Sequence, residues 1–95
     1  MMMTTGSAPV IALVIVPTYQ EAESIGPLLR QVLVADPRVD VLVVDDASPD
    51  GTADLVAAET DPRVHLLRRP GKAGLWTAYR AGFAWGLECG YHVLV

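Results

Sequence analysis

Two runs of mostly β-branched apolar residues, the second interrupted only by Asp40, constrain this chain more than any other feature. The first run, residues 10–16 (VIALVIV), is followed by Pro17. The second run, residues 39–44, is followed by Asp45 and Asp46. A half-exposed strand alternates apolar and polar residues, whereas a strand covered on both faces is apolar throughout. The two runs therefore predict two buried strands of a parallel sheet.

Helical patterns and turn signals separate the strands. Apolar residues at helical spacing predict a first helix from about Ser24–Gly26 to Ala35, with Pro27 in the first turn, where a missing N–H is tolerated. Ser48 is the expected N-cap of a short second helix. The remaining predicted elements are a short strand at 64–67, a turn at 69–71, a long helix at 73–89 and a strand at 91–95.

This order predicts an α/β fold, a Rossmann-like parallel sheet with helices on both faces and the order β-α-β-α-β-α-β. Connections of helical length favour right-handed crossovers. Ligands of such sheets bind outside the carboxyl ends of the strands. The residues that follow each strand are therefore the candidates for function. Residues 1–9 are expected to form a flexible N-terminus before a domain at 10–95.

Charge and cysteine content exclude several classes of function. A net charge of −4 argues against a general nucleic-acid binder, which needs a basic surface to neutralise phosphates. Cys89 is the only cysteine, so no intrachain disulfide can form and a reducing compartment is expected. No apolar segment reaches the roughly 20 residues of a membrane span.

A local basic cluster predicts either a solvated turn or a phosphate-facing site; it comprises Arg63, His65, Arg68, Arg69 and Lys72.

The segment after the first strand, PTYQE, combines a rigid proline, an aromatic ring and a carboxylate in Pro17, Tyr19 and Glu21. No glycine occurs between Val16 and Ile25, so the Gly-rich turns of dinucleotide-binding and P-loop proteins are missing. The ring could stack on a planar base, and the carboxylate could accept hydrogen bonds from it. A strand end followed by a solvated acidic loop is the alternative.

The segment after the second strand, VDDASPDGT, begins with two adjacent carboxylates. Successive strand residues point to opposite faces, so only one of Asp45 and Asp46 need face the crevice. Backbone N–H groups can hold the other. Asp50 lies near the start of the next helix, where the dipole favours negative charge, and is interpreted as structural.

The segment before the long helix carries Lys72, which could reach a diphosphate as a point charge. An exposed loop lysine is the alternative. Within the helix, Gly82, Gly86 and Gly90 recur every four residues, with Ala78 in the same register. This thin stripe predicts close packing of the helix on the sheet.

Three segments in this order, PTYQE, VLVVDDASPDGT and RRPGKAGLWTAYRAGF, resemble the family 2 glycosyltransferases. Within that family, SPDGT and RPGKAGL are most similar to the polyprenol (dolichol) phosphate mannose synthases. The resemblance covers residues 10–95 and implies a truncated nucleotide-binding domain, the N-terminal part of an A-type glycosyltransferase fold.

The resemblance also implies which side chains bind the nucleotide-sugar donor, GDP-mannose. The residues of the first motif would lie around guanine and ribose. A carboxylate that accepts from base N–H groups discriminates well, because the wrong base leaves it unpaired. The implied binding residues are Pro17, Tyr19, Glu21, Val44 and Asp46, with Asp45 and Lys72 as further candidates.

Three positions depart from the family pattern. Gln20 stands where relatives usually have Asn, and Ala47 stands where they usually have Asn or Gly. Trp76 replaces a common Gly, and its ring is expected either to pack on the sheet or to narrow the pocket.

The family's aspartate-rich metal motif follows the fourth strand, and this chain ends at Val95, inside that strand. The ligands of a divalent cation, Mg²⁺ or Mn²⁺, are therefore expected beyond Val95, with no catalytic or metal-binding residue within the chain. A diphosphate leaving group needs its charge neutralised, so the chain alone is predicted not to transfer sugar.

The complete enzyme would transfer mannose from GDP-mannose to a polyprenyl or dolichyl phosphate. It would act in the cytoplasm, at the cytoplasmic face of the membrane, and would touch the membrane only through the missing parts. No nucleic-acid partner is expected.

Two other classes remain as alternatives. A noncatalytic nucleotide-binding or interaction module would also keep the pocket without the metal motif. A phosphoacceptor receiver domain also places acidic pairs in a doubly wound sheet. Receivers, however, carry the pair after the first strand, and here it follows the second.

Overall fold

The computed structural model describes residues 12–95, and the flexible N-terminus expected at 1–9 lies outside them. Within this range, strands and helices alternate along the chain, which confirms the predicted α/β class. The elements are β1 (Ala12–Thr18), α1 (Ile25–Ala35), β2 (Val39–Asp46), α2 (Thr52–Ala57), β3 (Val64–Arg69) and α3 (Leu75–Glu88).

The sheet is parallel, in the order β1-β2-β3. Leu13 and Ile15 donate their N–H groups to carbonyl oxygens of segment 93–95 at 2.8 Å, along the edge of β1 away from β2. Among the described residues, the predicted fourth strand amounts to one parallel bridge between Leu13 and Leu94. Strand order therefore reverses beside β1, and doubly wound sheets bind ligands at such a switch point.

This topology rules out the receiver alternative. A receiver places its third strand next to its first, in the order 2-1-3. Here β3 pairs with β2, and the other edge of β1 contacts segment 93–95.

The first strand continues through Pro17, so the prediction that it ends there is wrong. Pro17 follows Leu13 and Ile15 in alternation, so its nitrogen lies on the edge of β1 away from β2, where a missing N–H removes no hydrogen bond to β2. On the other edge, Pro17 and Thr18 remain paired with β2. β2 and β3 also extend two residues beyond their predicted ends.

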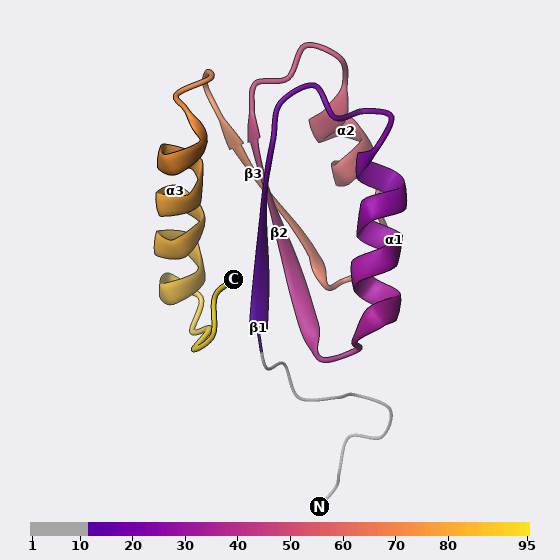
Figure 1. Cartoon of the computed structure of the whole chain (residues 1–95), viewed down its shortest axis with the longest axis vertical. Coiled ribbons are helices and arrows are strands. Elements are labelled where there is room, and N and C mark those ends of the chain that lie inside the picture. Colours follow the sequence, from indigo (N-terminus) through magenta and orange to yellow (C-terminus); the bar gives the residue numbers. More distant parts are fainter. Residues whose placement is uncertain (1–11) are drawn as a thin grey trace, which may run out of the picture.

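Helices cover both faces of the sheet, as predicted. Figure 1 shows α3 on one side of the strands and α1 with α2 on the other. Alternate residues of β2 serve two separate cores: Leu42 and Val44 pack beneath α3, and Val41 and Val43 pack beneath α1. Because both faces are covered, residues 41–44 of β2 are apolar without alternation.

Glycines bring α3 close to β1, as the stripe predicted. A Cβ atom on Gly82 would lie 2.6 Å from Cγ2 of Ile15, and one on Gly86 would lie 2.6 Å from Cδ2 of Leu94. Gly90 differs, because its φ of +90° turns the chain after α3 and open space surrounds it. The packing prediction holds for two of the three glycines.

The Gly90 turn anchors the chain before segment 93–95. The N–H of Tyr91 donates to the carbonyl of Gly86 at 3.0 Å, as in a Schellman motif. The Tyr91 ring stacks on Trp85, with centroids 6.2 Å apart, and its hydroxyl donates to the Asp40 carboxylate. Burial and this hydrogen bond raise the pKa of Tyr91, so the phenol remains a donor.

The first helix has its predicted bounds, but α2 begins at Thr52, and the prediction that Ser48 caps it is wrong. Ser48 instead donates to Asp45 and accepts from the N–H of Gln20. Gly51, with φ of +85°, makes the turn into α2. Ser48 thus contacts Asp45 and Gln20 and does not cap α2.

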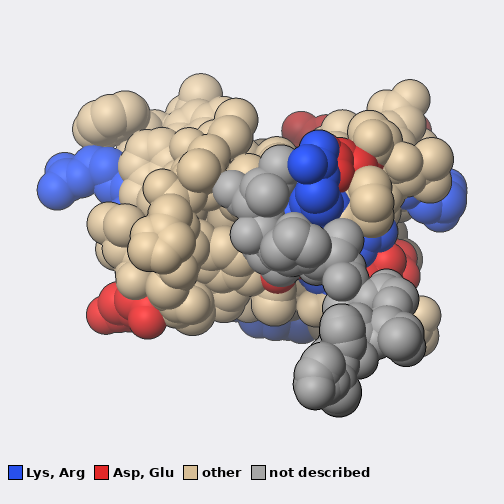
Figure 2. Space-filling view, turned by 90° about the horizontal axis from the view of Figure 1, so that it is seen from below, with Lys and Arg blue, Asp and Glu red and all other residues tan. Residues whose placement is uncertain are grey.

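The side of the molecule that carries α3 presents a broad surface with few charged residues (Figure 2). Leu75, Trp76 and Leu87 of this helix are exposed. None of the helices in residues 12–95 is long and apolar enough to cross a membrane.

Candidate functional site

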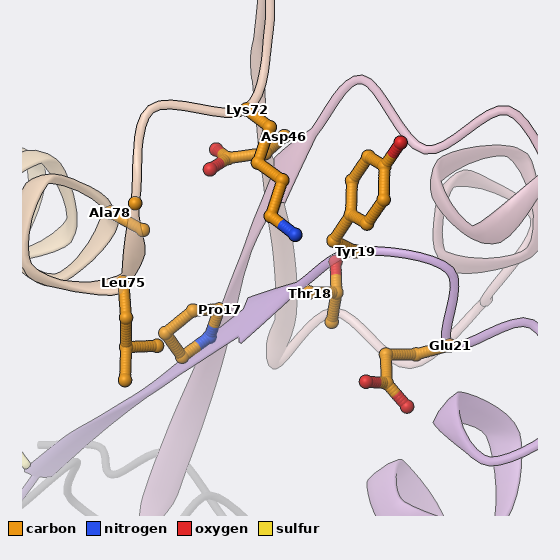
Figure 3. A pocket seen from close by; sticks show the side chains of 9 residues that line it. Pro17, Thr18, Tyr19, Glu21, Asp46, Lys72, Leu75 and Ala78 are labelled. Carbon is orange, nitrogen blue, oxygen red and sulfur yellow. The ribbon is translucent and has the colours of Figure 1, made fainter.

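A cavity at the carboxyl edge of the sheet collects most of the predicted site residues. The carboxyl ends of the strands lie at one edge, next to the start of α3 (Figure 1). The cavity has a volume of about 210 Å³, below the roughly 300–1,000 Å³ of pockets that enclose a whole small ligand. The described part of the cavity is thus too small to enclose a whole small ligand. Five predicted residues line it in Figure 3: Pro17, Tyr19, Glu21, Asp46 and Lys72.

The loop after β2 holds the loop after β1 in place. The side chains of Ser48, Thr52 and Asp50 accept hydrogen bonds from the N–H groups of residues 20, 21 and 22 at 2.9, 3.0 and 3.1 Å. The Thr52 hydroxyl beside Asp50, helped by backbone N–H donors, holds the pKa of that carboxyl below its usual range. Asp50 therefore has a structural role, and this clamp fixes the backbone between Tyr19 and Glu21.

The adjacent carboxylates of β2 point to opposite faces, as predicted. Asp45 is only 1% exposed and lies on the α1 side of the sheet. It accepts from the hydroxyl of Thr18 at 2.6 Å, and from the hydroxyl and N–H of Ser48 at 2.6 and 3.0 Å. These donors satisfy it away from the cavity, so the arrangement supports a structural role.

Asp46 lies on the α3 side and lines the cavity. Its carboxylate accepts from Nε and Nη2 of Arg69 at 2.7 and 3.2 Å, and from the N–H of Ala73 at 3.5 Å. Sequence reasoning placed Arg69 in a general basic cluster and missed this pairing. The pairing could have been inferred from position, because Asp46 and Arg69 are the last residues of two neighbouring strands.

Lys72 extends over the cavity from the loop between β3 and α3. Its Nζ atom lies 4.6 Å from the centroid of the Tyr19 ring, within cation–π range (Figure 3). The exposed side chain thus brings a positive charge to a cavity that also holds an aromatic face.

The remaining basic residues of the predicted cluster are dispersed. Arg63 donates to carbonyl oxygens at the end of α1, and Arg68 forms an exposed ion pair with α2. His65 contacts the start of β2. The interpretation as one phosphate-facing cluster is therefore wrong, because the side chains of β3 alternate between two faces.

Two residues singled out from the sequence lie away from the cavity lining. Val44 is fully buried in the core beneath α3, so a contact between its side chain and a nucleotide stays a prediction. Trp76 is 67% exposed and neither packs on the sheet nor narrows the cavity. The lining residues that sequence reasoning missed are Thr18, Gly74, Leu75 and Ala78.

Two of the departures from the family pattern adopt left-handed backbone, Gln20 with φ of +58° and Ala47 with φ of +53°. Glycine and asparagine tolerate this region best. We expect Ala47→Gly to raise the free energy of unfolding by about 0.5–1 kcal/mol in urea denaturation. Relief of about 1–2 kcal/mol of strain outweighs the added chain entropy of glycine.

The matched control is Ala57→Gly, at an exposed position of α2. It should lower the free energy of unfolding by about 0.5–1 kcal/mol, because no strain is relieved there. Equal destabilisation by both glycines would contradict the strain at Ala47.

The described residues do not provide a complete metal site. Within residues 12–95, no three His, Cys, Asp or Glu side chains lie where they could share a cation. Asp46, the buried carboxylate of the cavity, already binds Arg69 through both oxygens. The position of the metal ligands stays a prediction.

The family model described as glycosyl transferase family 2 matches residues 13–86. An undecaprenyl-phosphate mannosyltransferase of Micrococcus luteus is 60% identical over 86 residues, which cover 87% of this chain and 35% of that enzyme. A polyprenol monophosphomannose synthase of Mycolicibacterium smegmatis is 54% identical over 86 residues, 87% of this chain and 32% of that protein. The chain thus spans about a third of the length of these relatives.

A solved structure also resembles this chain, that of mannosyltransferase PcManGT from Pyrobaculum calidifontis in complex with GDP-Man and Mn²⁺. The TM-score is 0.73 at 32% identity, over 83% of this chain and 25% of the other. The fold, the order of the motifs and the matched range agree. The chain belongs to glycosyltransferase family 2 and has the A-type fold of that structural relative.

Proposed function

We propose that this chain forms the nucleotide part of the donor site of a polyprenyl-phosphate mannosyltransferase that uses GDP-mannose. The convergence of Tyr19, Asp46 and Lys72 on one cavity at the switch point of the sheet carries the proposal. The names of the Micrococcus and Mycolicibacterium relatives, and the GDP-Man bound to the Pyrobaculum relative, support it.

Guanine suits the part of the cavity formed by Asp46, Tyr19 and Glu21. An ionised carboxylate only accepts hydrogen bonds, so Asp46 favours a base edge that presents N–H donors. Guanine presents two adjacent donors, uracil presents one, and the corresponding edge of adenine presents an acceptor. The Tyr19 ring offers a face on which the base can stack, and Glu21 offers a second acceptor for the base or ribose.

The start of α3 and Lys72 suit a diphosphate. Gly74 and Leu75 line the cavity where α3 begins. The first N–H groups of a helix lack helical acceptors, and the dipole favours an anion there. With the ammonium of Lys72 over the same cavity, two features favour negative charge.

The chemical step needs parts beyond those described. We infer that an oxygen of a polyprenyl phosphate attacks the anomeric carbon of GDP-mannose with inversion, and that GDP leaves. A divalent cation, Mg²⁺ or Mn²⁺, would neutralise the leaving diphosphate. This reaction would take place in the cytoplasm, at the membrane face where the lipid acceptor lies.

A chimaeric enzyme tests the function. The matching third of the Micrococcus luteus enzyme is replaced by this chain, and transfer of labelled mannose from GDP-mannose to undecaprenyl phosphate is measured. We expect the chimaera to transfer mannose, and the 95-residue chain alone to bind GDP weakly without transfer. A Tyr19→Ala chimaera should show a raised KM for GDP-mannose.

The outcomes separate the alternatives. A folded chimaera that binds GDP-mannose and transfers nothing would favour a noncatalytic nucleotide-binding module. Equal use of UDP-glucose and GDP-mannose would contradict the proposed donor.

A further inference from the structure

The guanidinium of Arg69 forms a bidentate contact with the carboxylate of Asp46. The two residues are directly opposite each other at the ends of β3 and β2. Nε donates to Oδ1 at 2.7 Å and Nη2 donates to Oδ2 at 3.2 Å, and the side chains are only 14% and 7% exposed. A two-point contact of this kind fixes the plane of the carboxylate as well as its charge.

The same guanidinium reaches the first turn of α3. Nη2 of Arg69 donates to the hydroxyl of Thr77 at 2.9 Å. That hydroxyl lies 2.8 Å from the carbonyl oxygens of Ala73 and Gly74, to which it donates. Arg69 therefore joins Asp46 to the start of α3, where Gly74 and Leu75 also line the cavity.

Arg69 itself is not among the residues that line the cavity. Each carboxylate oxygen has two acceptor sites, and Arg69 occupies one on each oxygen of Asp46. The second acceptor site of Oδ1 is left for another partner, and that of Oδ2 meets only the long contact of 3.5 Å from the N–H of Ala73. Two adjacent donors, such as guanine N1–H and its exocyclic amine, match this spacing.

We propose that Arg69 is a positioning residue that sets the orientation of the Asp46 carboxylate and thereby the preference of the site for a base with two adjacent donors. The inference rests on the proposed function, because it assumes that Asp46 contacts the base. Lysine cannot replace Arg69, since an ammonium is a point charge without a planar fork.

The test is calorimetric titration of the 95-residue chain with GDP, IDP and UDP. IDP lacks the exocyclic amine of guanine. The variants are Arg69→Gln and Arg69→Lys, and the control is Arg68→Gln, which breaks an exposed pair with Asp54. Arg69→Gln and Arg69→Lys should reduce the preference for GDP over IDP about tenfold, and Arg68→Gln should leave it unchanged.

A thermodynamic cycle with Asp46→Asn shows whether Arg69 acts through Asp46. In the Asp46→Asn background, Arg69→Lys should change the GDP/IDP ratio little. Additive losses, or equal weakening of GDP and IDP binding by both Arg69 variants, would overturn the positioning role. A wild-type chain that binds UDP as tightly as GDP would contradict the proposed function instead.

Thermal unfolding of each variant separates these effects from misfolding. Arg69→Lys retains the charge beside Asp46 and is expected to remain folded. If it folds and keeps the wild-type GDP/IDP ratio, the proposal is wrong even if Arg69→Gln unfolds.

Discussion

Gly82→Ala is expected to lower the free energy of unfolding by about 2 kcal/mol, a melting-temperature loss of roughly 10 °C. The new Cβ would lie 2.6 Å from Cγ2 of Ile15, with Cδ1 and Cγ1 at 3.3 and 3.4 Å. Ile15 is buried and β-branched, so it has few other rotamers and α3 must move off β1. Overpacking of about 3 kcal/mol thus exceeds the gain in helix propensity of about 1 kcal/mol.

Gly26→Ala in α1 is the matched control. Apart from its chain neighbours, its Cβ would meet only the guanidinium of Arg30, at 3.6 Å, which is ordinary contact with the end of a flexible side chain. This variant should change the free energy of unfolding by less than about 1 kcal/mol, because the gain in helix propensity is opposed by the crowding of a side chain that precedes a helical proline. Equal melting temperatures for the two variants would contradict close packing of α3 on β1.

The burial of the strands and the directions of their side chains could be predicted from the sequence, because both depend on periodicity. Runs of mostly β-branched apolar residues identified β1 and β2 as buried on both faces, and the structure places one core on each side of β2. The period of two also predicted that Asp45 and Asp46 diverge, because a strand leaves each side chain no other direction.

What could not be predicted depends on partners distant in sequence. Ser48 looks like an N-cap by local rules, but its neighbours Asp45 and Gln20 provide better partners in the folded chain. Pro17 looks like a strand end until it is known which edge its missing N–H faces. Arg69 became part of the site only through the parallel register of β2 and β3.

The family resemblance supplied what periodicity could not. It joined Tyr19 and Glu21, already candidates at the end of the first strand, with Asp46 in one nucleotide site, whereas Lys72 was a candidate because of its charge. All four line one cavity, and their roles in binding stay predictions.

Asp46→Asn is expected to weaken GDP binding to this chain by about 10- to 100-fold, as measured by calorimetry. Asparagine keeps the shape of the side chain but replaces one acceptor oxygen with a donor, which opposes the N–H groups of guanine. Hydrogen bonds to a charged group contribute about 1.5–3 kcal/mol, which sets this range. The variant also loses one of its two contacts with Arg69, so titrations must be made well below its melting temperature.

Asp45→Asn is the control, since the two carboxylates are neighbours in sequence and face opposite sides of the sheet. Asp45 accepts from Thr18 and twice from Ser48, so an amide there would place one donor against another. We expect a loss of about 1–3 kcal/mol in the free energy of unfolding. GDP affinity should fall by less than with Asp46→Asn, because the Asp45 carboxylate itself does not line the cavity. If Asp45→Asn weakened GDP binding as much as Asp46→Asn in folded protein, assignment of base recognition to Asp46 would be wrong.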